Sequence, residues 1–152
     1  MTEKFSSVDE LLDFAIKQEE QAYDLYTDLA NKTNRTGTRD LFQQFAREEL
    51  GHKAKLLEIK QGKQFDPSPG KILDLKIGDY LLDVEPSPQM NYQDALIVAM
   101  KKEKVAFKMY SDMAASVGDP KLRETLLGLA NEEAKHKLRF ELEYDDEVLN
   151  QN

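Results

Sequence analysis

Two short segments decide the fold: Glu48-Glu49-Leu50-Gly51-His52 and Glu132-Glu133-Ala134-Lys135-His136. They hold the only two histidines of the chain, and each histidine follows the second Glu of a Glu-Glu pair by three residues. Residues three apart share one face of a helix. Each segment therefore predicts a carboxylate and an imidazole side by side, and the two segments lie 84 residues apart.

The same offset extends over much of the chain. Residues 11–30 align with residues 95–114 with eight identical positions of twenty, and the alignment continues without a gap through both histidines. Glu19 aligns with Glu103, whereas its neighbour Glu20 aligns with a lysine. The repeat indicates two pseudo-symmetric helical hairpins. Since one hairpin cannot bury its apolar face alone, we expect an all-α four-helix bundle.

Capping signals and helical periodicity predict where the helices begin and end. Ser7 and Glu10 have the spacing of a capping box, Asn91 is the expected N-cap of the third helix, and Asp119-Pro120 begins the fourth. Gly62 is the expected C-cap residue of the second. We expect helices at about 7–31, 38–60, 91–116 and 120–146, with a fraying end beyond them, in a single domain of residues 1–152.

The long connection at 61–91 is bounded by proline-rich stretches but is too apolar between them for a free linker. A crossover of this length can return the chain along a helix of roughly 35 Å. We expect it to lie along the bundle with one short helical turn, and its apolar side chains could cover the bundle or form a dimer surface.

Composition narrows the possible functions. The net charge of −8 and the pI of about 4.9 argue against a nucleic acid or an anionic membrane surface as partner. No apolar run approaches the roughly 18 residues of a membrane span, and the first residues lack a secretory pattern, so a cytoplasmic location is expected. The chain has no cysteine, which excludes disulfides, iron–sulfur clusters and thiolate metal sites.

Metal-binding side chains fall inside the apolar helix faces. Four carboxylates in a dry bundle core would repel one another unless they were protonated or bound to cations. Two divalent metals would balance them, and carboxylate with imidazole suits iron, manganese or zinc, whereas the absence of sulfur argues against Cu(I). The six candidate ligands are Glu19, Glu49 and His52 from the first hairpin, and Glu103, Glu133 and His136 from the second.

Two further pairs flank these residues. Glu48 and Glu132 lie one residue off the core face, so we expect them to be solvated or to contact a ligand from behind. Tyr26 and Tyr110 lie seven residues after Glu19 and Glu103 on the same helix faces. They are core residues first, and their hydroxyls can reach a ligand carboxylate.

These residues resemble those of the rubrerythrin and bacterioferritin branch of the ferritin-like superfamily, whose four-helix bundles hold a non-haem di-iron centre. The resemblance covers about residues 7–145 and rests on Glu19-x6-Tyr26, Glu49-x-x-His52, Glu103-x6-Tyr110 and Glu133-x-x-His136. It implies that Glu49 and Glu133 bridge two irons, that Glu19 and Glu103 are terminal ligands, and that His52 and His136 each hold one iron.

The resemblance also implies an activity: Fe(II) oxidation coupled to reduction of hydrogen peroxide or dioxygen, as in protection against oxidative stress. Three positions depart from the relatives. Rubrerythrins usually carry an extra Glu where this chain has Ala106, and their cysteine-ligated rubredoxin domain has no counterpart here, which implies a separate electron donor. Leu50 stands where bacterioferritins have a haem-ligating Met, so no haem is expected. No fifth helix is evident, which favours a homodimer over a storage cage.

Other functions stay open at this point. The bundle could buffer or sense iron, manganese or zinc without turnover, in which case metal would mainly stabilise the fold. It could instead be an oxygenase acting on an organic substrate, which requires an apolar channel to the metals. A metal-free structural bundle is the last alternative, and it requires protonated core carboxylates whose stability would fall as the pH rises.

Overall fold

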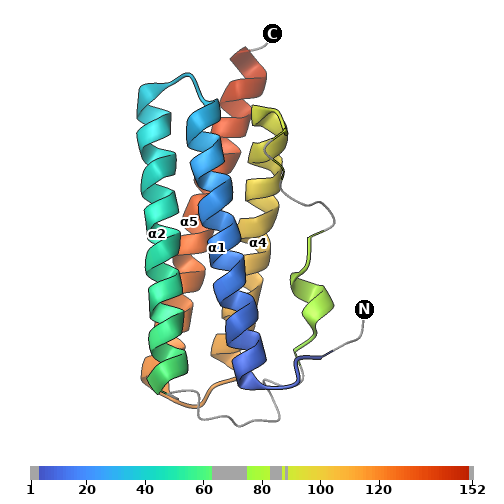
Figure 1. Ribbon diagram of the computed structural model, residues 1–152, viewed down its shortest axis with the longest axis vertical. Coiled ribbons are helices and arrows are strands. Elements are labelled where there is room, and N and C mark those ends of the chain that lie inside the picture. The colour runs from blue at the N-terminus through green and yellow to red at the C-terminus, as the bar shows by residue number, and fades with distance from the viewer. Residues whose placement is uncertain (1–3, 63–74, 83–86, 88, 151–152) are drawn as a thin grey trace.

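The computed structural model describes residues 4–62, 75–82, 87 and 89–150. Four long helices run side by side along the molecule (Figure 1). The helices are α1 (Val8–Lys32), α2 (Thr36–Gly62), α4 (Tyr92–Ala115) and α5 (Pro120–Asn150), with one 3-10 turn, η1 (Ile77–Tyr80). α1 packs extensively on α2 and α4 on α5, whereas α1 and α4 contact one another far less. The structure confirms the predicted all-α bundle of two hairpins.

Two helices begin where their capping residues predict. The Ser7 hydroxyl accepts a hydrogen bond of 3.0 Å from the backbone N–H of Glu10, and the Asn91 side chain accepts one of 2.8 Å from Asp94. The reciprocal half of the predicted capping box is displaced by one residue, because the Glu10 carboxylate accepts from the backbone N–H of Ser6. Both caps satisfy backbone donors that the first helical turn leaves free.

Two predicted helix ends were wrong. α2 begins at Thr36 and includes Gly62 as its last residue, so Gly62 does not lie beyond the helix. α5 continues to Asn150 instead of fraying at about 146. Tyr144 packs against the core cluster around Tyr26, and Arg35 forms an ion pair with Asp146, so the final turns of α5 extend from an anchored segment.

The described part of the crossover lies against α4 (Figure 1). The described part contains a 3-10 turn, η1, as a short helical turn in this connection was expected. Tyr80 is almost fully buried, and its hydroxyl donates a 2.7 Å hydrogen bond to Asp112 of α4. Phe5 stacks on Tyr80, and its backbone N–H donates to the Leu75 carbonyl. The rest of the predicted crossover, 63–74, 83–86 and 88, lies outside the described residues.

The hydrophobic core is divided into two clusters along the bundle. One contains Tyr26 and the other its repeat-equivalent Tyr110. The first is aromatic, since the rings of Phe42 and Phe45 each pack against Phe140, with centroids 5.5 Å and 5.6 Å away. The second is aliphatic at the equivalent positions, which are Leu126, Leu129 and Leu56. The candidate metal ligands belong to neither cluster, so both ends of the site are closed by apolar packing.

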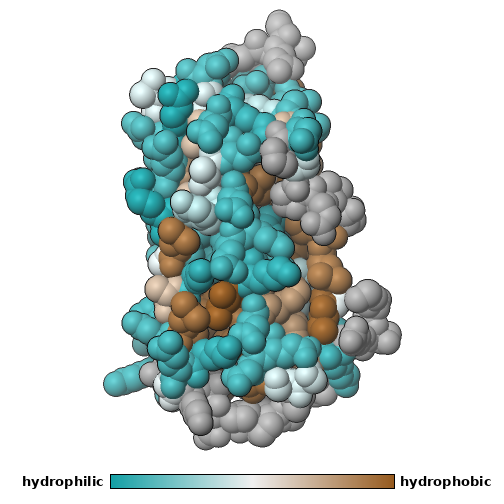
Figure 2. Space-filling model, in the orientation of Figure 1, coloured by the Kyte–Doolittle hydropathy of each residue, from teal (hydrophilic) through white to brown (hydrophobic). Residues whose placement is uncertain are grey.

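The face of the molecule seen in Figure 2 is largely hydrophilic. Figure 2 shows one face on which polar side chains dominate and apolar ones gather over the lower half. Within the described residues, no helix is both long and apolar enough to cross a membrane.

Replacing Phe140 by alanine tests the aromatic cluster. Phe140 is fully buried and contacts Tyr26, Phe42 and Phe45. We expect Phe140→Ala to lower the free energy of unfolding of the metal-free protein by about 3–5 kcal/mol, measured by urea denaturation. Leu149→Ala is the control, because Leu149 is 72% exposed and its removal should change stability by less than about 0.5 kcal/mol. Equal losses in the two variants would contradict the assigned core.

Candidate metal centre

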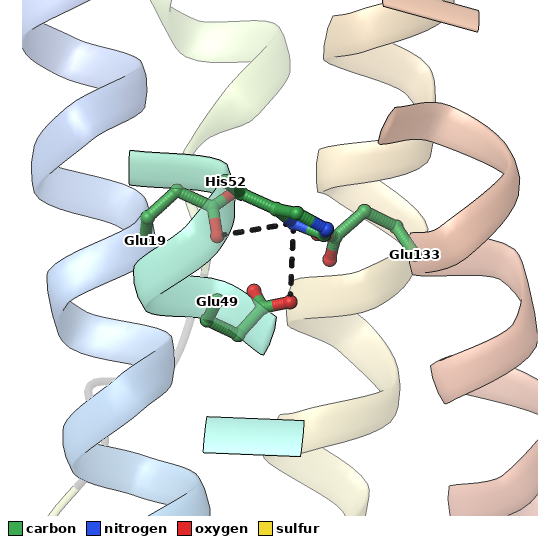
Figure 3. Close-up of side chains that lie close together, drawn as sticks. All are labelled: Glu19, Glu49, His52 and Glu133. Carbon is green, nitrogen blue, oxygen red and sulfur yellow. Dashed lines mark ion pairs between the residues drawn. The ribbon is translucent and has the colours of Figure 1, made fainter. Parts of the chain in front are cut away.

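The six candidate ligands converge between the two hydrophobic clusters. Ligand atoms of Glu19, Glu49, His52 and Glu133 all lie within 4.8 Å of one another, and Figure 3 shows these side chains converging from α1, α2 and α5. The second group is Glu49, Glu103, Glu133 and His136, with the same spacing. The two groups share Glu49 and Glu133. A shared carboxylate has two oxygens, so each of these residues is placed to bridge two ions.

The site is buried, and the protein leaves several of its polar atoms without a hydrogen bond. The six side chains are between 0% and 4% exposed. Several of their ligand-type atoms lie close to one another but form no hydrogen bond of acceptable geometry: Oε2 of Glu19 and Glu103, Oε1 of Glu49, both oxygens of Glu133, and Nδ1 of His52 and His136. Unsatisfied buried polar atoms are costly. Their convergence into two oxygen and nitrogen groups fits two divalent cations such as iron, manganese or zinc.

Each histidine presents Nδ1 to the centre. Nδ1 of His52 lies 2.6 Å from Glu133 and 3.4 Å from Glu49. Nδ1 of His136 lies 3.2 Å from Glu49 and 3.6 Å from Glu103. A neutral imidazole protonated at its other nitrogen, Nε2, has a lone pair on Nδ1 that is available to a metal.

Glu48 and Glu132 fix that arrangement from behind. Nε2 of His52 contacts the Glu132 carboxylate, and Nε2 of His136 lies 3.3 Å from Glu48. Each carboxylate comes from the opposite hairpin and accepts a hydrogen bond from the Nε2–H group of the histidine. A carboxylate behind a ligating histidine sets its tautomer and ring orientation. Of the two roles left open for Glu48 and Glu132, the structure favours contact with the ligands.

The two tyrosines also act across the hairpins. The Tyr26 hydroxyl donates to Glu103, and the Tyr110 hydroxyl donates to Glu19 at 2.5 Å. Both phenols are fully buried. Each leaves one oxygen of its carboxylate, Oε2, without a hydrogen bond. The tyrosines therefore orient Glu19 and Glu103, the two carboxylates that are not shared between the ligand groups.

Burial and mutual repulsion perturb the acids of the centre. Burial raises the pKa of Glu49, Glu103 and Glu133 well above the ordinary value, and the charges of neighbouring glutamates raise it further. Burial opposes protonation of His52, but its contacts with Glu133 and Glu19 outweigh burial and raise its pKa to about 12. Without metal, the centre is therefore stabilised by protons.

All ten residues singled out from the sequence, the six candidate ligands and the two flanking pairs, meet at this centre. Sequence reasoning missed the buried Lys102, which directly precedes Glu103, and its contacts with Gln18 and Gln21 on α1. The signal available was weak: the repeat aligns Lys102 with Gln18, and a lysine in a helix is ordinarily exposed.

Comparison with known proteins agrees with the geometry. The sequence model of the rubrerythrin family matches residues 10–144. The chain belongs to the rubrerythrin family. Rubrerythrin-family proteins bind a di-iron centre. This chain has two buried groups of Glu and His side chains that can hold metal. No curated protein matches the chain.

Two solved structures share the fold of this rubrerythrin-family chain. One, from Thermotoga maritima, was assigned to the ferritin-like diiron-carboxylate proteins; it is 16% identical with a TM-score of 0.77, and the match covers 97% of this chain and 99% of that one. The other is a hypothetical protein from Pyrococcus furiosus, 27% identical with a TM-score of 0.75, with 97% and 93% covered. The first shows the fold alone.

The raised pKa values predict how stability depends on pH. A group whose pKa rises on folding stabilises the protein fully below its unfolded pKa and less as the pH rises towards the folded one. The stabilisation from the three glutamates therefore begins to be lost as the pH rises above their ordinary pKa of 4.5, and that from His52 as the pH rises above 6.5. Metal-free protein should therefore be more stable at about pH 5 than at about pH 8 in urea denaturation. Greater stability at the higher pH would contradict proton stabilisation of the centre.

Removing the carboxylates behind the histidines should weaken metal binding. We expect Glu132→Ala and Glu48→Ala each to lower Co(II) affinity by about 10–100-fold in chelator competition, since the histidine loses its orienting partner. Glu124→Ala is the matched control, because Glu124 is an exposed glutamate of α5. An affinity equal to that of the wild type in both test variants would show that the contacts do not orient the histidines.

Proposed function

We propose that this protein is a non-haem di-iron oxidoreductase that couples Fe(II) oxidation to reduction of hydrogen peroxide or dioxygen. The observation that carries the proposal is the pair of buried four-residue groups that share Glu49 and Glu133. A shared pair of carboxylates holds two ions close together. Two irons, when bound, would supply the two electrons that reduction of peroxide to water requires.

The protein's own residues would prepare the centre in three ways. Tyr26 and Tyr110 hold Glu103 and Glu19 in place by hydrogen bonds. Glu48 and Glu132 keep the proton of each histidine on Nε2, which leaves the Nδ1 lone pair available to a metal. The two hydrophobic clusters exclude bulk water from both ends, and electrostatic interactions are stronger in such a site.

The size of the cavity beside the centre supports a small oxidant. It measures about 20 Å³ and borders Glu19, Glu49, Glu103 and Glu133. One ordered water requires roughly 10–15 Å³ by this measure. Peroxide and dioxygen are close to that size, whereas an organic substrate would need the protein to open. The cavity therefore favours an oxidant over the substrate of an oxygenase.

The proposal also requires an electron donor, a physiological metal and a setting for the protein. The chain has no cysteine, so we infer that a separate donor protein restores Fe(II). We also propose iron as the physiological metal, with manganese or zinc as competitors for the same ligands. A homodimer in the cytoplasm is the setting we infer from the sequence.

A non-catalytic iron buffer is the second candidate. The observation that favours it is the near-complete burial of all six ligands, which would slow metal release. Buffering and catalysis differ in turnover. A buffer binds two metals tightly and gains stability from them, but its Fe(II) form would react slowly with both oxidants.

Loss of a shared carboxylate tests the proposal. We expect Glu133→Ala to lower binding from two metals to at most one per chain and to slow peroxide-dependent oxidation of the Fe(II)-loaded protein at least about 100-fold, because both ligand groups lose a member. Stopped-flow absorbance after anaerobic Fe(II) loading measures the rate. Glu58→Ala is the control, since the side chain of Glu58 is 71% exposed. Oxidation at the wild-type rate in Glu133→Ala would rule out chemistry at this centre.

A further inference from the structure

The cavity beside the carboxylates lies on one side of the centre only. Its lining includes four ligand glutamates and Tyr26 but neither histidine. On the other side, His52 and His136 are backed by Glu132 and Glu48. A small molecule in the cavity would therefore meet the centre from the side of α1 and α4, where the oxygens are not covered by imidazole rings.

The packing of α1 against α4 leaves room for that approach. These helices contact one another far less than the helices within each hairpin do. Ala22 and Ala106, which occupy equivalent positions in the repeat, both line the cavity. Small side chains at two facing positions keep the space open, since larger ones would fill it.

Lys102 is the basic side chain among the residues that line the cavity. It is 6% exposed, and its Nζ donates hydrogen bonds to the side-chain oxygens of Gln18 at 3.1 Å and Gln21 at 3.3 Å. Lys102 and Gln18 both line the cavity. The lysine therefore spans from α4 to α1 beside the space that leads to the carboxylates. A buried ammonium is costly, so this position calls for an explanation.

The ammonium distinguishes among small molecules by polarity. It can donate a hydrogen bond to an oxygen of hydrogen peroxide and attracts small anions, and a hydrogen bond to a charged group is stronger than one between neutral groups. Dioxygen is apolar and gains little from either interaction. Size alone does not separate these two oxidants, whereas a charged donor beside the cavity can.

We propose that the α1/α4 cavity is the path by which the oxidant reaches the metals, and that Lys102 is a specificity-determining residue that favours hydrogen peroxide over dioxygen. The inference rests on the proposed function in that it names which oxidant the centre uses. The path itself serves any small ligand of a metal held there.

Variants of Lys102 test the role of its charge. Lys102→Met keeps the length and removes the charge, and Lys102→Gln introduces the residue that the repeat already accommodates at position 18. Lys102→Arg is the conservative rescue. All variants are first checked for two bound metals per chain, which separates a loss of selectivity from a loss of the centre.

The first readout is binding and does not depend on turnover. Azide is the probe, added to Co(II)-loaded protein and followed in the visible spectrum. We expect Lys102→Met and Lys102→Gln to weaken azide binding by about tenfold, the scale of one nearby charge in a partly buried site, and Lys102→Arg to restore most of it. Unchanged azide affinity in both uncharged variants would overturn the role of Lys102.

The second readout is the choice of oxidant by Fe(II)-loaded protein. We expect Lys102→Met to slow the peroxide reaction by about tenfold and to change the dioxygen reaction by less than about twofold. Equal effects on the two rates would overturn the selectivity. If the wild type reacts with neither oxidant but the azide results are as expected, the proposed function fails and the path stands.

Filling the cavity tests the path itself. Ala106→Leu should slow azide association with Co(II)-loaded protein at least about tenfold while two metals remain bound, because the added carbons occupy the space beside the carboxylates. Ala54→Leu is the matched control: Ala54 is exposed on α2, and its repeat-equivalent in α5 is already a leucine, Leu138, that is 59% exposed. Association at the wild-type rate in Ala106→Leu would place the path elsewhere.

Discussion

Four carboxylates buried in one layer of the core are the constraint on which the rest of this structure depends. Their mutual repulsion and desolvation must be offset by protons or by cations. The geometry suits cations, because several ligand-type atoms form no hydrogen bond of acceptable geometry and the two groups share Glu49 and Glu133. The same layer divides the hydrophobic core, so that stability outside the centre comes from two separate clusters.

The supporting contacts of the centre all run between hairpins. Tyr26 of the first hairpin orients Glu103 of the second, and His136 of the second is backed by Glu48 of the first. The repeat produces the reverse pair in each case. Neither hairpin can therefore orient its own ligands, and the centre forms only when the two pack.

Much of this could be predicted from the sequence, because the repeat aligns ligands with ligands and a spacing of three places Glu and His together on a helix. Capping chemistry likewise located the starts of α1 and α4. The length of α5 could not be predicted, since its last turns depend on partners distant in the chain. Nor could the burial of Lys102, because a lysine in a helix is exposed by default and its hydrogen bonds to Gln18 and Gln21 depend on how α1 packs beside α4.

Lys102 and Gln18 break the symmetry between the two halves of the molecule. They occupy equivalent positions, and their side chains meet, so they lie where the two halves of the molecule face one another. Two separate, identical hairpins could place only two glutamines or two lysines there, and two buried ammonium groups would repel each other. In a single chain the two positions vary independently, so an ammonium on one helix can face an amide at the equivalent position of the other. Joining the halves thus allows a centre with matching ligands to be approached through asymmetric surroundings.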